Sequence, residues 1–293
     1  MLHNSEKDFI RRHIGPSDND QKKMLKDLDF NSLDDLINST VPEKIQFKGE
    51  LNIGEPNSEY EALRKLKAIS KKNQIYSNFI GMGYYGTYTP YVILRNILEN
   101  PGWYTSYTPY QPEVAQGRLE MLLNFQQMIV DFTGMDIANA SLLDEGTAAA
   151  EAMGLSHRLN KSDSNLVFVS ENCHPQTIDV IQTRAEPLGL KVLVGNEDKV
   201  LEQLKEDIVC GILQYPGTLG DIKDPGEAIS KIHKKNGKAI LACDLLALGK
   251  LKTPRELGAD IAVGSSQRFG IPMGYGGPHA AFFATKDEYK RSM

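Results

Sequence analysis

The second half of the chain alternates short apolar runs with stretches whose apolar residues recur at helical spacing. Apolar runs bounded by turn residues predict strands, and recurrence every three or four residues predicts amphipathic helices. Strands separated by such helices favour right-handed crossovers, so we expect an open α/β domain with a mainly parallel sheet and helices on both faces. The predicted strands are NLVFVS, KVLVG, IVCGILQYP, KAILACD, DIAVG and AAFFAT, with helices near 145–159, 176–188, 200–205 and 226–235.

The first hundred residues have a different pattern, in which short helical stretches alternate with polar or irregular ones. Ser17 and Ser32 precede apolar residues at helical spacing and stand where N-caps are expected. Ser58 and Glu61 have the spacing of a capping box, in which each side chain bonds the other residue's backbone N–H. We expect the helix that follows Ser58 to end near Asn73.

Two stretches rich in Gly and Tyr, YSNFIGMGYYGTYTP and GWYTSYTPYQP, predict loops on either side of a short helix that opens at Pro90. A longer helix is expected over 113–133, closed by Gly134. We therefore divide the chain into a helical, loop-rich amino-terminal segment over 1–112 and an α/β domain over 113–293. The latter ends soon after AAFFAT without a closing helix, so we expect it to be incomplete at its carboxy end.

The composition is that of an ordinary globular protein, with 24% charged and 41% hydrophobic residues. A formal net charge of −5 gives no support for nucleic acid binding, which requires a basic face. The best apolar run, 239–248, is interrupted by Asp244 and falls short of the roughly 18 residues that cross a bilayer. The start of the chain lacks the apolar core of a signal peptide. We expect a cytoplasmic protein of bacterial type that binds neither nucleic acid nor membrane.

The three cysteines, Cys173, Cys210 and Cys243, are more than 30 residues apart and form no zinc or redox motif. Cys210 and Cys243 lie within predicted strands, where a buried, reduced thiol is the usual state. We expect no metal site.

Ligands of open parallel sheets bind beyond the carboxyl ends of the strands, so the residues just after each strand are the candidates for chemistry. The candidates are the turn with Gly146 and Thr147, His174 after NLVFVS, Asp244 after KAILAC, and the segment GSSQRFGIPMGYGGPH after DIAV. This constellation resembles the fold type I pyridoxal phosphate enzymes. In those enzymes a Gly/Thr turn holds the phosphate, a His stacks on the pyridine ring, an Asp pairs with the ring nitrogen, and a later lysine forms the Schiff base.

The Schiff-base lysine has no counterpart in this chain. Arg268 lies 24 residues after Asp244, where a lysine would be expected, and its neighbour is Gln267; no lysine occurs between Lys252 and Lys286. A guanidinium stays protonated and delocalised, so it does not form an imine as a lysine amine does. The carboxylates beside Gly146 also oppose a phosphate dianion. We predict a site with the shape of the family but without its covalent chemistry.

Several local sequences together resemble the amino-terminal half of glycine cleavage P-proteins: RRHIGPSDNDQKKML, SNFIGMGYYGTYTP, WYTSYTPYQPEVAQGRLEMLLNFQQMIVDFTGMDIANASLLDEGTAAAEAM, ENCHPQT, LQYPGTLGD and GADIAVGSSQRFGIPMGYGGPHAAFFAT. The match covers nearly the whole chain. The RHIGPS and SLLDEGTAAAEAM segments look more like the single-chain form of the family than its two-subunit form. We therefore expect a truncated single-chain P-protein.

The resemblance implies a division of labour between two halves of a glycine decarboxylase. The carboxy-terminal half, which this chain lacks, holds pyridoxal phosphate on its lysine. The full enzyme decarboxylates glycine and passes the aminomethyl group to the lipoyl arm of H-protein, in an assembly expected to be dimeric. This chain would contribute no catalytic residue, and Tyr84, Tyr85 and Thr89 would line the glycine and cofactor pocket across the interface. Gly146, Thr147, His174, Asp244, Gln267 and Arg268 are then degenerate cofactor-site positions.

Structural alternatives exist for each of these features. His174 can be a buried histidine with satisfied hydrogen bonds, and Asp244 a relic carboxylate bound to backbone. GYGGPH can be a phosphate cradle, but isolated glycine runs are weak signals and a tight turn before AAFFAT is favoured. At the level of the whole chain, the alternative is a catalytically silent interaction or scaffold protein derived from the same half.

Overall fold

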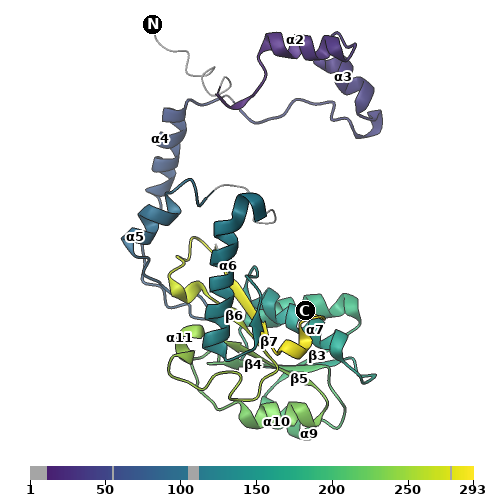
Figure 1. The fold of residues 1–293 in the computed structure, drawn as a ribbon, viewed down its shortest axis with the longest axis vertical. Helices are drawn as coiled ribbons and strands as arrows, with labels where there is room; N and C mark the ends of the chain where they lie inside the picture. The colour runs from purple at the N-terminus through teal and green to yellow at the C-terminus, as the bar shows by residue number, and fades with distance from the viewer. Residues whose placement is uncertain (1–11, 55, 105–111, 278) are drawn as a thin grey trace. The chain divides into compact units, whose positions relative to one another are not determined.

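The computed structural model describes residues 12–54, 56–104, 112–277 and 279–293 (Figure 1). Contacts within the chain group it into two compact units, Met1–Ser77 and Asn78–Met293. From Asn78 onward, the first Gly/Tyr-rich stretch therefore groups with the α/β part and not with the amino-terminal helices. The domain boundary expected at 112 stays a prediction. Part of the second Gly/Tyr-rich stretch, 105–111, lies outside the described residues.

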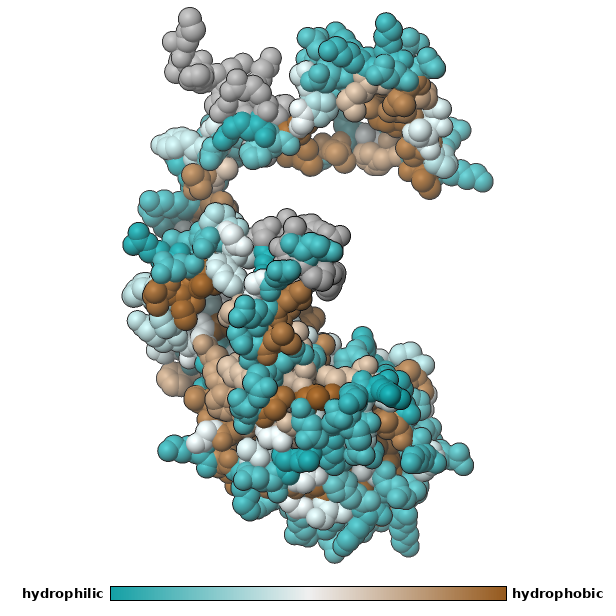
Figure 2. Space-filling model, in the orientation of Figure 1, coloured by the Kyte–Doolittle hydropathy of each residue, from teal (hydrophilic) through white to brown (hydrophobic). Residues whose placement is uncertain are grey.

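The first unit is helical, as predicted. It holds α2 (Asp18–Asp27), α3 (Leu33–Thr40), the 3-10 turn η1 (Glu43–Ile45) and α4 (Glu59–Ser70). Ser17, Ser32 and Ser58 each accept a hydrogen bond from the backbone N–H three residues later, and Glu61 completes the capping box of α4. None of these helices buries a side chain, and apolar residues remain at their surface (Figure 2).

The second unit contains a seven-stranded sheet in the order β1-β7-β6-β5-β4-β2-β3. The strands are β1 (Ile137–Ala138), β2 (Leu166–Ser170), β3 (Lys191–Gly195), β4 (Cys210–Tyr215), β5 (Lys238–Cys243), β6 (Ile261–Ser265) and β7 (Ala281–Thr285). The strands β3, β2, β4, β5 and β6 pair in parallel, and β7 pairs antiparallel with β6 and β1. The mainly parallel sheet predicted from the alternation of elements is confirmed.

Helices cover both faces of this sheet. On one face lie α6 (Pro112–Thr133), α9 (Glu197–Gln203), α10 (Gly226–Lys234) and α11 (Leu245–Leu248), and on the other lie α7 (Glu145–Leu159) and α8 (Pro175–Ala185). The other helical elements of this unit are α5 (Tyr91–Ile93), the π-helical turn η2 (Leu94–Leu98), η3 (Glu186–Leu188), η4 (Gln267–Phe269) and η5 (Asp287–Tyr289). Alternate residues of each strand enter two cores. Val167 and Ile212 pack with α7 and α8, whereas Phe168 and Leu213 pack with α6, α9 and α10.

Three details differ from the sequence-based expectation. In the described part of the connection from β6 to β7, η4 is the only helical element and there is no crossover helix, and β7 pairs antiparallel with β6. Strand β1 has two residues, too few for a pattern to predict. Helix α9 starts before the range predicted near 200–205, because Asn196 caps it by accepting from the N–H groups of Asp198 and Lys199.

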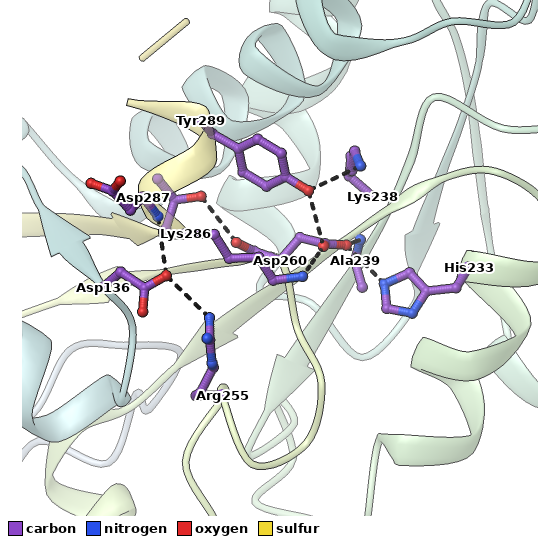
Figure 3. A network of polar contacts seen from close by, with 10 residues as sticks. Asp136, His233, Lys238, Ala239, Arg255, Asp260, Lys286, Asp287 and Tyr289 are labelled. Carbon is purple, nitrogen blue, oxygen red and sulfur yellow. Dashed lines mark hydrogen bonds and ion pairs between the residues drawn. The ribbon is translucent and has the colours of Figure 1, made fainter. Parts of the chain in front are cut away.

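A buried carboxylate connects several strands at the end of the sheet opposite the candidate site (Figure 3). Asp260, just before β6, accepts hydrogen bonds from the Ala239 N–H of β5 and from Lys286 after β7. His233 of α10 lies 2.8 Å from the same carboxylate. This one side chain therefore connects three neighbouring strands and a helix.

The three cysteines are free and buried, as predicted, and Cys210 and Cys243 lie in β4 and β5. Among the described residues, no helix has the length and apolarity needed to span a bilayer.

Candidate functional site

The candidate residues meet at the carboxyl ends of β2, β4, β5 and β6, beside the amino end of α7. Two small cavities of about 80 and 20 Å³ adjoin there and share Gly83, Glu145, His174 and Ser265. We call the residues around them the strand-end site: Gly83, Tyr84, Tyr85, Glu145, Gly146, His174, Gln176, Gln214, Asp244, Ser265, Gln267, Arg268 and His279. The site lies where ligands of open α/β sheets bind.

Arg268, at the predicted lysine position, is bound to Asp244. Its Nη2 and Nε atoms donate to Asp244 Oδ2 at 2.8 and 3.1 Å. Its guanidinium carbon also lies 3.7 Å from the ring centroid of Tyr85, which is a close cation–π contact. Asp244 in turn caps α11 by accepting from the Leu246 N–H. The carboxylate that would pair with a pyridine nitrogen is therefore already neutralised.

His174 is buried and uncharged. The Thr218 hydroxyl donates to the Asn172 carbonyl, so its oxygen is free to accept from His174 Nδ1 at 2.9 Å. This places the ring proton on Nδ1 and leaves the Nε2 lone pair toward Glu145, whose Oε1 is 3.8 Å away. Burial lowers the pKa of His174 to about 4, although the charge of Asp244 opposes the shift. The structural alternative for His174, a histidine with a satisfied hydrogen bond, describes this arrangement.

Glu145 stands at the first turn of α7 and is the most perturbed carboxyl group of the strand-end site. Burial raises its pKa to about 7, with a hydrogen bond from Gln214 opposing the shift and the charge of Asp244 adding to it. Within the described residues, its Oε1 atom is buried without a hydrogen-bond partner. Glu145 is therefore mostly protonated below pH 7, beside a neutral His174.

The residues of this chain do not fit pyridoxal phosphate. Cavities of about 80 and 20 Å³ are far below the roughly 300 Å³ at which small-molecule pockets begin. At the amino end of α7, the Asp144 carboxylate already accepts from the Thr147 N–H at 2.7 Å, where a phosphate would bind. A Cβ on Gly146 would lie 3.2 Å from Val180, so this glycine serves the close packing of α7 on α8. Arg268 supplies no amine for an imine.

The structure brings most of the predicted site residues together. Tyr84, Tyr85, Gly146, His174, Asp244, Gln267 and Arg268 line the two cavities. Thr147 and Thr89 are not among the lining residues: the Thr147 N–H is bound by Asp144, and the Thr89 hydroxyl donates to the Gly270 carbonyl at 2.5 Å. Within GYGGPH, residues 274–277 form a turn in which Gly276 and Gly277 donate to the Met273 carbonyl, as the turn interpretation predicts, and Pro278 lies outside the described residues.

Other residues of the site were not singled out from the sequence, although Ser265 and His279 lie within the candidate segment GSSQRFGIPMGYGGPH. Gln176, Gln214, Ser265 and His279 line the cavities, and Thr218 holds His174. Gln214 and Ser265 end predicted strands, so the strand-end rule that selected Asp244 could also have selected them. His279 packs edge-on against Tyr84, with ring centroids 5.3 Å apart, a long-range contact that no local pattern announces.

Comparison with known proteins identifies the family. The profile of the glycine cleavage system P-protein matches residues 11–293. The "Glycine dehydrogenase (decarboxylating)" of Pelagibacter ubique (strain HTCC1062) is 83% identical over 293 residues, which is 100% of this chain and 30% of that protein. The protein of the same name from Stutzerimonas stutzeri (strain A1501) is 57% identical over 285 residues, or 97% of this chain and 29% of that protein.

A solved structure agrees with the sequence comparison. The crystal structure of glycine decarboxylase (P-protein) of the glycine cleavage system, in inhibitor-bound form, matches with a TM-score of 0.85 and 33% identity over 94% of this chain and 63% of that chain. The α/β fold of the pyridoxal phosphate enzyme type, predicted from the sequence, is thereby confirmed. The chain spans about 30% of the length of the curated relatives. It belongs to the glycine cleavage system P-protein family and represents part of its amino-terminal half.

Proposed function

We propose that this chain is the half of a glycine decarboxylase that lacks the Schiff-base lysine and so does not bind the cofactor covalently. The observation that carries the proposal is the Arg268–Asp244 pair, which fills the position of the Schiff-base lysine and its aspartate with a closed ion pair. A half that has the fold but lacks this chemistry contributes by binding the other half and shaping its pocket. The covalent cofactor then belongs to the carboxy-terminal half of the enzyme.

In this proposal the chain helps to wall the glycine pocket of the other half. Tyr84, Tyr85 and Thr89 are the residues offered across the interface. Loss of carbon dioxide removes the carboxylate charge of glycine, so the reaction is favoured by a dry wall with few competing anions. Tyrosine supplies apolar area together with a hydroxyl donor, and so excludes water while orienting a polar substrate.

The remaining partners belong to the same proposal. The full enzyme would pass the aminomethyl group from glycine to the lipoyl arm of H-protein, as a dimeric assembly in the cytoplasm. The names of the relatives support the decarboxylation of glycine, and the family profile supports membership of the glycine cleavage system. The alternative is an interaction protein that binds a partner without taking part in chemistry.

A chimera separates the two functions. This chain would replace the matching segment of the Pelagibacter ubique protein, to which it is 83% identical. Exchange of labelled carbon dioxide into glycine, with lipoylated H-protein present, is then measured for the chimera, for this chain alone and for the rest of the relative alone. We expect exchange by the chimera only. A chimera that assembles but exchanges no carbon dioxide would favour the interaction protein, and exchange by this chain alone would contradict the lysine-less interpretation.

A further inference from the structure

The segment 78–90, here called the Gly/Tyr loop, carries the tyrosines of the proposed pocket wall but has little hydrophobic anchoring of its own. Phe79 is 93% exposed and Tyr88 is 75% exposed. Gly81, Met82 and Gly83 have consecutive φ values of 64°, 53° and 84°. Left-handed backbone at the non-glycine residue Met82 is unfavourable and persists only where surrounding contacts hold it. Something outside the loop must therefore fix its conformation.

The contacts that hold the loop come from the strand-end site. Gln176 Nε2 donates to the Met82 carbonyl at 2.7 Å, beside the left-handed residues. Gln267 Nε2 donates to the Tyr85 carbonyl at 2.9 Å and to the Ile271 carbonyl at 2.7 Å. Each donor thus binds a backbone group of the loop, so the contacts fix its path and not merely its side chains.

Arg268 and His174 add packing to these hydrogen bonds. The Arg268 guanidinium lies against the ring of Tyr85, and the Asp244 carboxylate holds that guanidinium in place. A Cβ built on Gly83 would lie 3.5 Å from the His174 ring, so the backbone of the loop runs along this buried histidine. The position that would carry the lysine is therefore occupied by a contact to the loop.

A second set of contacts joins the loop to the segment after η4. The hydroxyls of Thr87 and Thr89 donate to the carbonyls of Ile271 and Gly270, at 2.8 and 2.5 Å. Figure 1 shows the two segments side by side next to α5. Gln267 links both sets, because it bonds the loop and Ile271 with the same amide and is only 2% exposed. A buried side chain that donates to both segments is well suited to connect them.

We propose that the degenerate cofactor site is an anchor for the Gly/Tyr loop, in which Gln176, Gln267 and Arg268 act as positioning residues for Tyr84 and Tyr85. This inference rests on the proposed function, since the loop matters for glycine only if it walls the pocket of the other half. The arginine at the lysine position and the small cavities then have a structural role, because the residues at the cofactor-site positions support the Gly/Tyr loop.

The anchor makes a kinetic prediction. If only the anchored loop is competent to receive glycine, the apparent dissociation constant of glycine rises as the anchored fraction falls, while saturating glycine restores the competent state. Weakening the anchor should therefore raise KM and leave kcat nearly unchanged. A merely structural role gives the opposite split, because unfolded molecules lower kcat and leave KM unchanged.

Thr87 offers a matched pair of variants. Thr87→Val keeps the shape and removes the donor to Ile271, whereas Thr87→Ser keeps the donor. In the chimera described above, we expect Thr87→Val to raise the KM for glycine by up to about fivefold, the limit set by one neutral hydrogen bond, with kcat within about twofold. Thr87→Ser should remain close to the unsubstituted chimera. Gln267→Met removes two hydrogen bonds and should raise KM further.

Hydrogen exchange of the chain itself tests the anchor without any activity. Within the loop, the N–H groups of Ile80 and Tyr84 donate to Asn78 Oδ1 and to the Gly81 carbonyl. These two amides should exchange about fivefold faster in Thr87→Val and faster still in Gln267→Met, while those of β4 and β5 keep their protection. Unchanged exchange in the loop overturns the inference, as does faster exchange with an unchanged KM in an active chimera. An inactive unsubstituted chimera instead contradicts the proposed function, and hydrogen exchange still decides whether the anchor exists.

Discussion

The carboxylate of Asp244 and the guanidinium of Arg268 face each other with two hydrogen bonds to one oxygen, at 2.8 and 3.1 Å. Both side chains are partly buried, with 15% and 27% of their surface exposed. In a cofactor-binding site of this fold the same two positions would hold separate roles, one toward the pyridine nitrogen and one toward the aldehyde. Here the two side chains bind each other, so neither is available to a cofactor.

Restoring the lysine alone should therefore not restore the chemistry. In Arg268→Lys the new ammonium would lie beside Asp244, which holds it in the protonated, non-nucleophilic form, and the cavities would remain too small for the cofactor. We expect that treatment with pyridoxal phosphate and borohydride leaves the peptide spanning position 268 unmodified in mass spectrometry. Stoichiometric reduction of an imine at that position would show that the site still accepts the cofactor.

Breaking the pair should destabilise the chain. Asp244→Asn keeps an oxygen to cap α11 but leaves the Arg268 charge without its partner, which should cost about 2–3 kcal/mol in the free energy of unfolding. The exposed pair Lys252–Asp224, whose side chains are 66% and 65% exposed, supplies the control. Asp224→Asn should change stability by less than about 0.5 kcal/mol. Equal effects of the two variants in urea denaturation would contradict the claim that the partly buried Asp244 pair stabilises the chain more than the exposed pair.

Glu145 and His174 should make opposite contributions to the pH dependence of stability. The raised pKa of Glu145, from 4.5 to about 7, means that its native state binds more protons, so its contribution is lost as pH rises from 4.5 to 7. The lowered pKa of His174, from 6.5 to about 4, means that its contribution is lost as pH falls from 6.5 to 4. Between pH 4.5 and 6.5 the two slopes oppose each other, and the unsubstituted chain should show a nearly flat profile.

Single substitutions should uncover each slope. Glu145→Gln leaves His174 alone, so stability should fall on acidification below pH 6.5. His174→Gln leaves Glu145 alone, so stability should fall as the pH rises toward 7. Each change should reach up to about 3 kcal/mol, at about 1.4 kcal/mol for each pH unit between the native and unfolded pKa values. Urea midpoints across pH 4 to 7 measure both; parallel profiles for the two variants would contradict the assigned protonation states.

Whether the sequence predicts a given contact depends on how many residues separate its two partners along the chain. The caps at Ser17, Ser32 and Ser58 and the parallel strands follow from local pattern, and the structure has them. Asp244 and Arg268 were found because a spacing of 24 residues carries the resemblance. The bond from Gln176 to Met82 joins residues 94 apart, and that from Gln267 to Tyr85 joins residues 182 apart. No spacing rule covers such distances, so the support of the Gly/Tyr loop required the structure.

Asp260 offers the strongest single test of what holds the sheet edge together (Figure 3). Its side chain is 5% exposed and accepts from Ala239 N–H and His233 Nε2, each at 2.8 Å, and from Lys286 at 2.5 Å. Burial alone would raise its pKa, but the hydrogen bonds from His233, Lys286 and Ala239 outweigh burial and hold the pKa well below its ordinary value. The charged form is therefore strongly favoured in the native state.

Asp260→Asn should cost about 3–5 kcal/mol, since it leaves the partly buried Lys286 ammonium without a counter-charge and turns an acceptor into a donor. Asp287→Asn, at an exposed pair with Lys290, is the matched control and should have little effect. Because the native pKa of Asp260 is lowered, its contribution is present above the unfolded value of 3.8 and is lost as pH falls below it. Acid unfolding should therefore be less steep in Asp260→Asn than in the unsubstituted chain. An equal acid sensitivity in both, followed by circular dichroism, would place the acid-labile group elsewhere.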